Sequence, residues 1–274
     1  MKLKLAILDL YNGTKNKGMQ CIKDIVNTYQ DQIEWQVYDV RQEGALPDTS
    51  YDIYISSGGP GSPLNGEGVA GWDQKYSEWI DMIWTWNQSD ANVKKHVFFI
   101  CHSFQMACAH FKLGSIVPRK SMSFGTFPIH QTDEGKNELV FSGLENPFYA
   151  ADFRRWQFIQ SDEDRFEDIG ASILALEKVR PHVELERAVM AVRFSDELVG
   201  VQFHPEADSE GMLEHFQGDE LKQEIIKNHG RQKYASILRD LKMPGRIELT
   251  HNTVIPNFLK NAIELLHKEL RLAA

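Results

Sequence analysis

Hydrophobic positions along the chain alternate between short apolar runs and longer segments with apolar residues every three or four positions. The apolar runs predict strands over residues 3–8, 34–40, 51–55 and 96–100. The segments with helical spacing predict helices over residues 18–29, 72–86 and 103–111. Strands that alternate with helices are typical of βαβ units and a parallel sheet.

The second half of the chain has a different pattern. Residues 120–160 form short alternating pieces with turn residues, which predict an antiparallel insertion or a sheet edge. Further strands are expected over residues 172–176, 188–194 and 198–203, and Ser195-Asp196-Glu197 predicts a hairpin turn between the last two. The predicted fold is α/β, a three-layer sandwich with a mostly parallel central sheet.

The pattern changes again after Ala207. Residues 221–227 and 232–241 look helical, and a last helix has Pro256 in its first turn, where a missing N–H costs nothing. One face of that helix is apolar and consists of Ile255, Phe258, Leu259, Ala262, Ile263, Leu266 and Leu270. We therefore expect a main domain over residues 1–207 and a helical extension over residues 208–274, packed on that domain or on a partner subunit.

Charge and cysteine content narrow the function classes. The 274-residue chain has a net charge of −9, and the acidic excess lies in the first 207 residues, so we expect no nucleic-acid partner. No apolar run approaches the ~20 residues of a membrane span, and the start lacks a signal-peptide pattern. Cys21, Cys101 and Cys108 match neither a disulfide framework nor a zinc pattern. These observations predict a cytoplasmic protein with no membrane segment, metal or cofactor.

Three pieces with chemical potential each follow a predicted strand. They are the glycine-rich loop at residues 58–61, Cys101, and the His204-Pro205-Glu206 triplet. The carboxyl ends of parallel strands line one crevice, so these pieces are expected to converge there.

Cys101 lies where an apolar strand ends and a helix begins, which is the setting of a nucleophile elbow. The helix N-terminus beside it favours the thiolate, the reactive form. The alternative is a buried structural cysteine, which is common in apolar strands, and Cys108 fits that description better. His204 is placed to take the thiol proton, with Glu206 holding its other ring nitrogen.

The loop at residues 58–61 offers backbone N–H groups with no side chains in the way. It is a poor phosphate cradle because no Gly-Lys-Ser/Thr follows it. We expect an oxyanion hole instead, with one donor at Gly59 and the other at the amide of His102.

These three pieces, in this order, resemble the class I glutamine amidotransferases over about residues 1–207. The resemblance implies a flavodoxin-like fold, a γ-glutamyl thioester on the cysteine, and release of ammonia. It also implies that Cys101 is the nucleophile, His204 the base and Glu206 its orienter. Gln105, four residues past the nucleophile, matches the family's substrate-contacting glutamine.

The chain departs from the family pattern at two places. The usual Gly-x-Cys-x-Gly-x-Gln motif has Phe99 and Ser103 in place of its glycines. The segment over residues 148–158, where many members carry a histidine, has Arg154 and Arg155 instead. A guanidinium group can bind a carboxylate through two parallel hydrogen bonds. We therefore predict that one of these arginines binds an anionic group of the substrate. The alternative is a pair of solvated arginines on an edge strand.

The leading hypothesis is a stand-alone glutamine amidotransferase-like hydrolase that acts on glutamine or a γ-glutamyl amide. The ammonia passes to a separate synthase, or the enzyme simply hydrolyses a γ-glutamyl compound. One alternative is a protease-like or deglycase-like cysteine hydrolase that uses Cys101 with His102, and another is a catalytically silent binding protein of the same fold. The physiological amide and the formation of a homo-oligomer stay open.

Overall fold

A single central sheet organises the molecule. The computed structural model describes residues 2–14, 16–90, 93–180, 186–243 and 245–273. Within these residues the sheet has nine strands in the order β2-β1-β3-β4-β9-β8-β7-β5-β6. Their bounds are β1 Leu3–Asp9, β2 Ile33–Asp39, β3 Ile53–Ser56, β4 His96–Ile100, β5 Ser115–Gln131, β6 Phe148–Ile159, β7 Ser172–Glu177, β8 Val189–Arg193 and β9 Leu198–Val201.

The two halves of the sheet are paired differently. Strands β2, β1, β3, β4 and β9 pair in parallel, whereas every pairing from β9 through β8, β7 and β5 to β6 is antiparallel. Alternating direction across the second half leaves only β8 and β5, among the described strands, running against the rest. The prediction of a mostly parallel central sheet is therefore confirmed.

The segment over residues 120–160 is an antiparallel edge of the sheet, as predicted, but its strands are longer than expected. Instead of short pieces, it contains most of β5 and β6, two long strands paired antiparallel over most of their length. Within β5 the register with β6 shifts between Pro118 and Ser123, whereas Gly135, Gly143 and Pro147 lie in the connection between the two strands. A bulge absorbs the residues that looked like a strand break, because an irregular ladder tolerates a proline.

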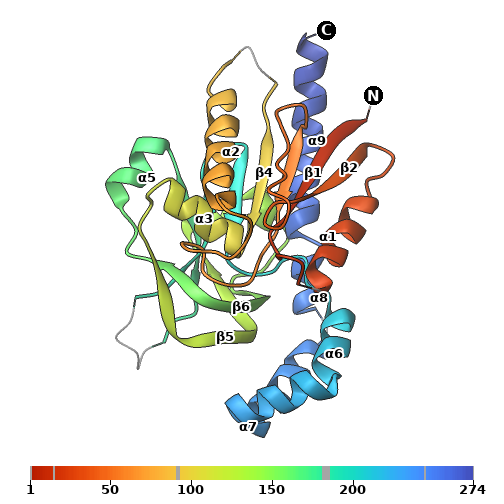
Figure 1. Ribbon diagram of the computed structural model, residues 1–274, viewed down its shortest axis with the longest axis vertical. Coiled ribbons are helices and arrows are strands. Elements are labelled where there is room, and N and C mark those ends of the chain that lie inside the picture. Colours follow the sequence, from red (N-terminus) through yellow and green to blue (C-terminus); the bar gives the residue numbers. More distant parts are fainter. Residues whose placement is uncertain (1, 15, 91–92, 181–185, 244, 274) are drawn as a thin grey trace.

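Helices cover both faces of the sheet, as a three-layer sandwich requires (Figure 1). Helix α1 (Lys17–Asn27) packs on one face, while α2 (Trp72–Asn87) and α3 (His102–His110) pack on the other. The aromatic stripe of α2 belongs to the core on its face, with Trp72, Tyr76 and Trp79 all buried. Three short helical segments lie between later strands, namely α4 Asp133–Lys136, η1 Leu139–Phe141 and α5 Glu163–Ile169.

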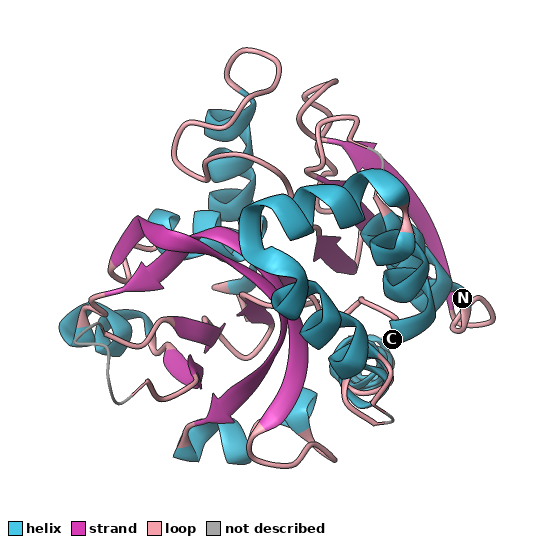
Figure 2. Cartoon of the chain, turned by 90° about the horizontal axis from the view of Figure 1, so that it is seen from below, coloured by secondary structure: helices cyan, strands magenta, loops and turns pink. Residues whose placement is uncertain are grey.

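The last quarter of the chain forms two helical parts. Helix α6 (Ser209–Gln217) and α7 (Asp219–Leu241) form an arm at the end of the sheet away from the start of β1 (Figure 1). Figure 2, viewed from the arm's end, shows this arm crossing in front of the sheet. Helix α7 is interrupted at Gly230, whose φ of +84° is not helical. The sequence pattern predicted two separate helices around this point.

Helix α8 (Ile247–His251) leads into α9 (Val254–Ala273), which lies along the same face as α1. The apolar face of α9 packs on this chain's own sheet, where the rings of Phe98 and Phe258 are 5.1 Å apart. Of the predicted face, only Leu270 is exposed. Among the described residues, no helix is both long enough and apolar enough to cross a membrane.

Candidate active site

Three neighbouring strands bring the predicted functional pieces together. Strands β3, β4 and β9 lie side by side in parallel, and they end at Ser56, Ile100 and Val201. The glycine-rich loop, Cys101 and the His204 triplet follow these three ends. The convergence expected for the crevice of a parallel sheet is therefore observed.

The backbone at Cys101 forms a sharp turn between β4 and α3. Its φ of +49° and ψ of −95° are rare for a residue with a side chain, and such strain is typical of a functional turn. The Cys101 amide donates to the Val201 carbonyl at 2.8 Å. Ser103, which replaces a family glycine, accepts from the Ile100 amide and donates to the Ser56 carbonyl, each at 2.8 Å. Ser103 therefore ties the elbow to two adjacent strands.

Phe99, the other residue that replaces a glycine of the motif, is accommodated by the neighbouring strand. Phe99 pairs with Gly200 of β9, and a Cβ at Gly200 would lie 3.1 Å from the Cβ of Phe99. The Phe99 ring packs against Phe194, in the core cluster on the α2 and α3 face of the sheet. The bulk of Phe99 is thus matched by the missing side chain at Gly200.

The imidazole of His204 is held from two sides. Its Nδ1 and the Oε1 of Glu206 are 2.8 Å apart, and its backbone amide donates to the Ala151 carbonyl of β6 at 2.8 Å. A Cβ at Gly58 would lie 2.9 Å from Cε1 of His204, so only glycine lets the loop approach the ring this closely. Burial by itself would lower the pKa of His204, but Glu206 and Cys101 outweigh burial and raise that pKa well above its usual value.

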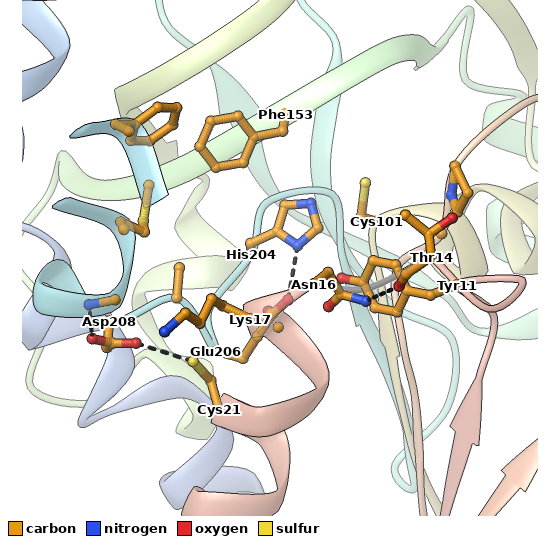
Figure 3. A pocket seen from close by; sticks show the side chains of 17 residues that line it. Tyr11, Thr14, Asn16, Lys17, Cys21, Cys101, Phe153, His204, Glu206 and Asp208 are labelled. Atoms are coloured by element: carbon orange, nitrogen blue, oxygen red, sulfur yellow. Dashed lines mark hydrogen bonds and ion pairs between the residues drawn. The ribbon is translucent and has the colours of Figure 1, made fainter. Parts of the chain in front are cut away.

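A cavity of about 290 Å³ opens beside these groups. It is lined by Tyr11, Thr14, Asn16, Lys17, Gly18, Cys21, Gly59, Pro60, Cys101, Phe153, His204, Glu206, Ala207, Asp208, Gly211, Met212 and Phe216. Figure 3 shows His204 in this cavity with Glu206 on one side and Cys101 on the other. Part of the wall comes from α1 and part from α6, which lies outside the predicted domain over residues 1–207.

Gly59 and His102 have different relations to the cavity. Gly59 lines it, and a Cβ there would collide with the carbonyl oxygen of Leu10. The ring of His102 does not line it; that ring lies against Trp72 with 6.4 Å between centroids. Burial and the nearby Arg41 lower the pKa of His102 to about 3. The His102 ring, which the alternative hydrolase would use with Cys101, therefore does not line the cavity.

Gln105 is connected to Cys101 through Gln202. Its amide donates to Gln202 Oε1 at 2.8 Å and to the Trp156 carbonyl at 3.1 Å, and Gln105 does not line the cavity. Gln202 in turn donates to the sulfur of Cys101 at 3.6 Å. Gln202 was not predicted from the sequence, although its place directly after β9 and two residues before His204 was a usable signal.

The two arginines occupy opposite environments. Arg154 is buried and lies 3.0 Å from Asp152 and 3.4 Å from Glu177, whereas Arg155 is exposed. Opposite faces are expected for adjacent strand residues. Neither arginine is among the residues that line the cavity.

Cys21 is an unforeseen part of the cavity wall. Its thiol donates to Asp208 at 3.1 Å, and burial together with this contact raises the pKa of Cys21 to about 12. Cys108 lies in the core cluster on the α2 and α3 face of the sheet, where burial raises its pKa well above the usual value.

Tyr11 also lines the cavity and was not predicted from the sequence. Its pKa is raised by burial and by the nearby Glu206. In the described part of the chain, no group of three or more His, Cys, Asp or Glu is arranged to hold a metal ion.

Solved structures share this fold at low sequence identity. A glutamine amidotransferase from Thermotoga maritima is 14% identical, with a TM-score of 0.70 and coverage of 96% of this chain and 99% of that one. A Thermoplasma acidophilum protein described as a GMP synthase subunit is 14% identical, with a TM-score of 0.58 and coverage of 100% and 98%. The glutaminase domain of the Trypanosoma brucei CTPS, with bound acivicin, is 16% identical, with a TM-score of 0.51 and coverage of 77% and 89%.

No curated protein sequence matches the chain. The family model for glutamine amidotransferase class-I matches residues 7–223, which include the glycine-rich loop, Cys101, the His204 triplet and helix α6. The chain belongs to the class I glutamine amidotransferases.

Proposed function

We propose that this protein hydrolyses the γ-amide of glutamine, or of a γ-glutamyl amide, through a thioester on Cys101. The observation that carries the proposal is the elbow cysteine beside a histidine held by Glu206 at 2.8 Å, on the wall of one cavity. Family members act on glutamine and often work with a separate synthase, so the ammonia acceptor would be another protein.

His204 would move the proton in both halves of the reaction. It takes the proton of the Cys101 thiol, and the sulfur attacks the γ-carbonyl carbon. As the C–N bond breaks, His204 returns the proton to the leaving amine, and the acyl group stays on sulfur. A water molecule, deprotonated by His204, then attacks the thioester and releases glutamate and the thiol. Glu206 keeps the imidazole oriented throughout.

The negative oxygen of each tetrahedral intermediate needs donors nearby. We assign this role to backbone N–H groups at Gly59 and His102, since Gly59 lines the cavity and His102 begins α3 directly after the nucleophile. The positive end of α3 acts in the same direction.

We also propose a division of labour along the chain. Residues 1–207 carry the reacting groups, and residues 208–274 supply a cover and part of the cavity wall. Asp208, Gly211, Met212 and Phe216 support this division because they line the cavity without taking part in proton transfer.

Ammonia release tests the proposal when combined with covalent labelling. A glutamine-like diazo-ketone should inactivate the protein and modify Cys101, as found by mass mapping of peptides. The Cys101→Ser variant should neither release ammonia nor be labelled, while Cys108→Ser serves as the matched control and should retain both properties. Modification of Cys21 or Cys108 with Cys101 untouched would refute the assignment.

A further inference from the structure

One side of the cavity is built from three apolar side chains. The ring of Phe153 in β6 lies 5.9 Å from the ring of His204, and the ring of Phe216 in α6 lies 5.8 Å from that of Phe153. Met212, one turn before Phe216, lines the same cavity. We call Phe153, Met212 and Phe216 the apolar wall. Figure 3 shows Phe153 directly beside the imidazole.

The proposed chemistry places the leaving group near this wall. Nδ1 of His204 is occupied by Glu206, so Nε2 must both accept the thiol proton and deliver it to the departing amine. The nitrogen of that amine must then lie within hydrogen-bond distance of the ring. Any substituent on the amine extends past the imidazole, where Phe153 stands.

The cavity must hold the γ-glutamyl group together with the leaving amine. Its volume of about 290 Å³ is on the order of ten times the ~30 Å³ share of one water in the liquid. Sites that bind small molecules are usually apolar cavities with a few polar groups, and this cavity combines the apolar wall with the polar groups of His204, Glu206 and Asp208.

The charged groups that line the cavity make contacts of their own within the chain. Lys17 lies 2.7 Å from Glu214, and Asp208 accepts from the Gly211 amide and from the Cys21 thiol. The apolar wall itself offers no charged side chain, so a charged group seated against it would lose hydration without forming an ion pair with the wall.

We propose that the preferred substrate is a γ-glutamyl amide whose leaving amine bears an uncharged aryl or branched alkyl group, seated on the apolar wall. This inference rests on the proposed function. The bonds made and broken stay the same: the C–N bond is cleaved, water is consumed, and the amine leaves with the proton from His204 in place of ammonia.

The test compares three amides that all yield glutamate, namely L-glutamine, γ-glutamyl-benzylamide and γ-glutamyl-glycine. One methylene in an apolar pocket changes specificity by roughly 10- to 200-fold, so kcat/KM for the benzylamide should exceed that for glutamine at least about tenfold. Met212→Gln keeps the side-chain length but adds an amide, and it should reduce this preference about tenfold. Met82→Gln on the exposed side of α2 is the matched control and should leave the preference unchanged.

Binding to the Cys101→Ser variant separates this inference from the proposed function. Calorimetry should show tighter binding of the benzylamide than of glutamine or γ-glutamyl-glycine. Equal binding of all three, or tightest binding of γ-glutamyl-glycine, would overturn the apolar leaving-group site even if the wild type releases glutamate from each. Tighter benzylamide binding without glutamate release by the wild type would support the site and refute the proposed hydrolysis.

Discussion

Two of the polar clusters buried among the described residues differ in what their charges face. In the first, His204 is held by Glu206 and faces Cys101 across a cavity. In the second, Arg154 is enclosed between Asp152 and Glu177, and Arg119 pairs with Glu177 at 3.0 Å. The His204 side chain keeps 13% of its surface exposed, whereas that of Arg154 keeps 1%.

The difference teaches how to recognise a functional charge. In the arginine cluster each carboxylate is matched by guanidinium groups, and these outweigh the effect of burial so that the pKa of Glu177 falls below its usual value. In the histidine cluster one ring nitrogen is left for a reacting proton. A buried charge does not by itself mark a functional site. A buried titratable group marks one when an atom that can exchange a proton faces a cavity.

The largest expected effect tests the cluster of His204, Glu206 and Cys101 at the cavity. His204→Ala should lower kcat at least about a thousandfold, because no other imidazole among the described side chains lines the cavity to move the proton. His102→Asn, the matched control, should cost less than about tenfold, since the predicted contribution of His102 is its backbone amide. Steady-state ammonia release from folded protein gives both numbers. The reverse ranking would favour the alternative hydrolase that uses Cys101 with His102.

Substitutions in the cluster of Arg154, Asp152 and Glu177 should change the free energy of unfolding rather than the rate of catalysis. Arg154→Ala leaves Asp152 and Glu177 short of a cation, and breaking such a buried pair typically costs about 3–5 kcal/mol. Arg155→Ala, on the exposed face of the same strand, should change the free energy of unfolding by less than about 0.5 kcal/mol. Urea denaturation measures both. A large rise in KM for Arg154→Ala with unchanged stability would instead support the substrate-binding role predicted from the sequence.

Sequence patterns predicted the parallel half of the molecule because its signals are local. A strand such as β4 is a continuous apolar run, and Cys101 follows it directly, so strand, elbow and proposed nucleophile could be located together. The same holds for β9 and His204. In a parallel sheet, the ends of neighbouring strands meet without any further information on packing.

The remaining features depend on contacts between distant segments. Helix α6 reaches the cavity through its packing on β6, and Arg154 finds Glu177 only because β6 and β7 both flank β5. The 12-residue length of β6 was also missed, since it requires β5 as a partner. Periodicity does not encode such pairings, and a single sequence offers no other guide to them.

A third buried group, His96, should make the stability of the protein depend on pH. Burial, with help from Arg193 and Lys95, lowers the pKa of His96 to about 4. The unfolded chain, with a histidine pKa of about 6.5, binds this proton more readily, so the contribution to stability is complete above pH 6.5 and is lost as the pH falls towards 4. His96→Leu should flatten the loss between pH 7 and pH 4 by on the order of 3 kcal/mol. Urea denaturation at several pH values measures the free energy of unfolding. The prediction is wrong if this free energy falls equally steeply with decreasing pH in the wild type and in His96→Leu.

The smallest expected effect concerns two thiols in one cavity. Cys21 and Cys101 both line it, but only Cys101 has an imidazole beside it, whereas Cys21 is buried against Asp208 with a pKa of about 12. At pH 8 a pKa of about 12 leaves roughly one Cys21 in ten thousand as thiolate, so iodoacetamide should modify Cys101 first.

Asp208→Asn removes the negative charge that disfavours the Cys21 thiolate, while burial, the larger cause of the raised pKa, stays. Cys21 should then react several-fold faster, yet still more slowly than Cys101, as followed by mass spectrometry of the labelled peptides. If Cys21 in the wild type is modified as fast as Cys101, the two thiols are chemically alike, and the distinction between an open and a satisfied polar group would not hold.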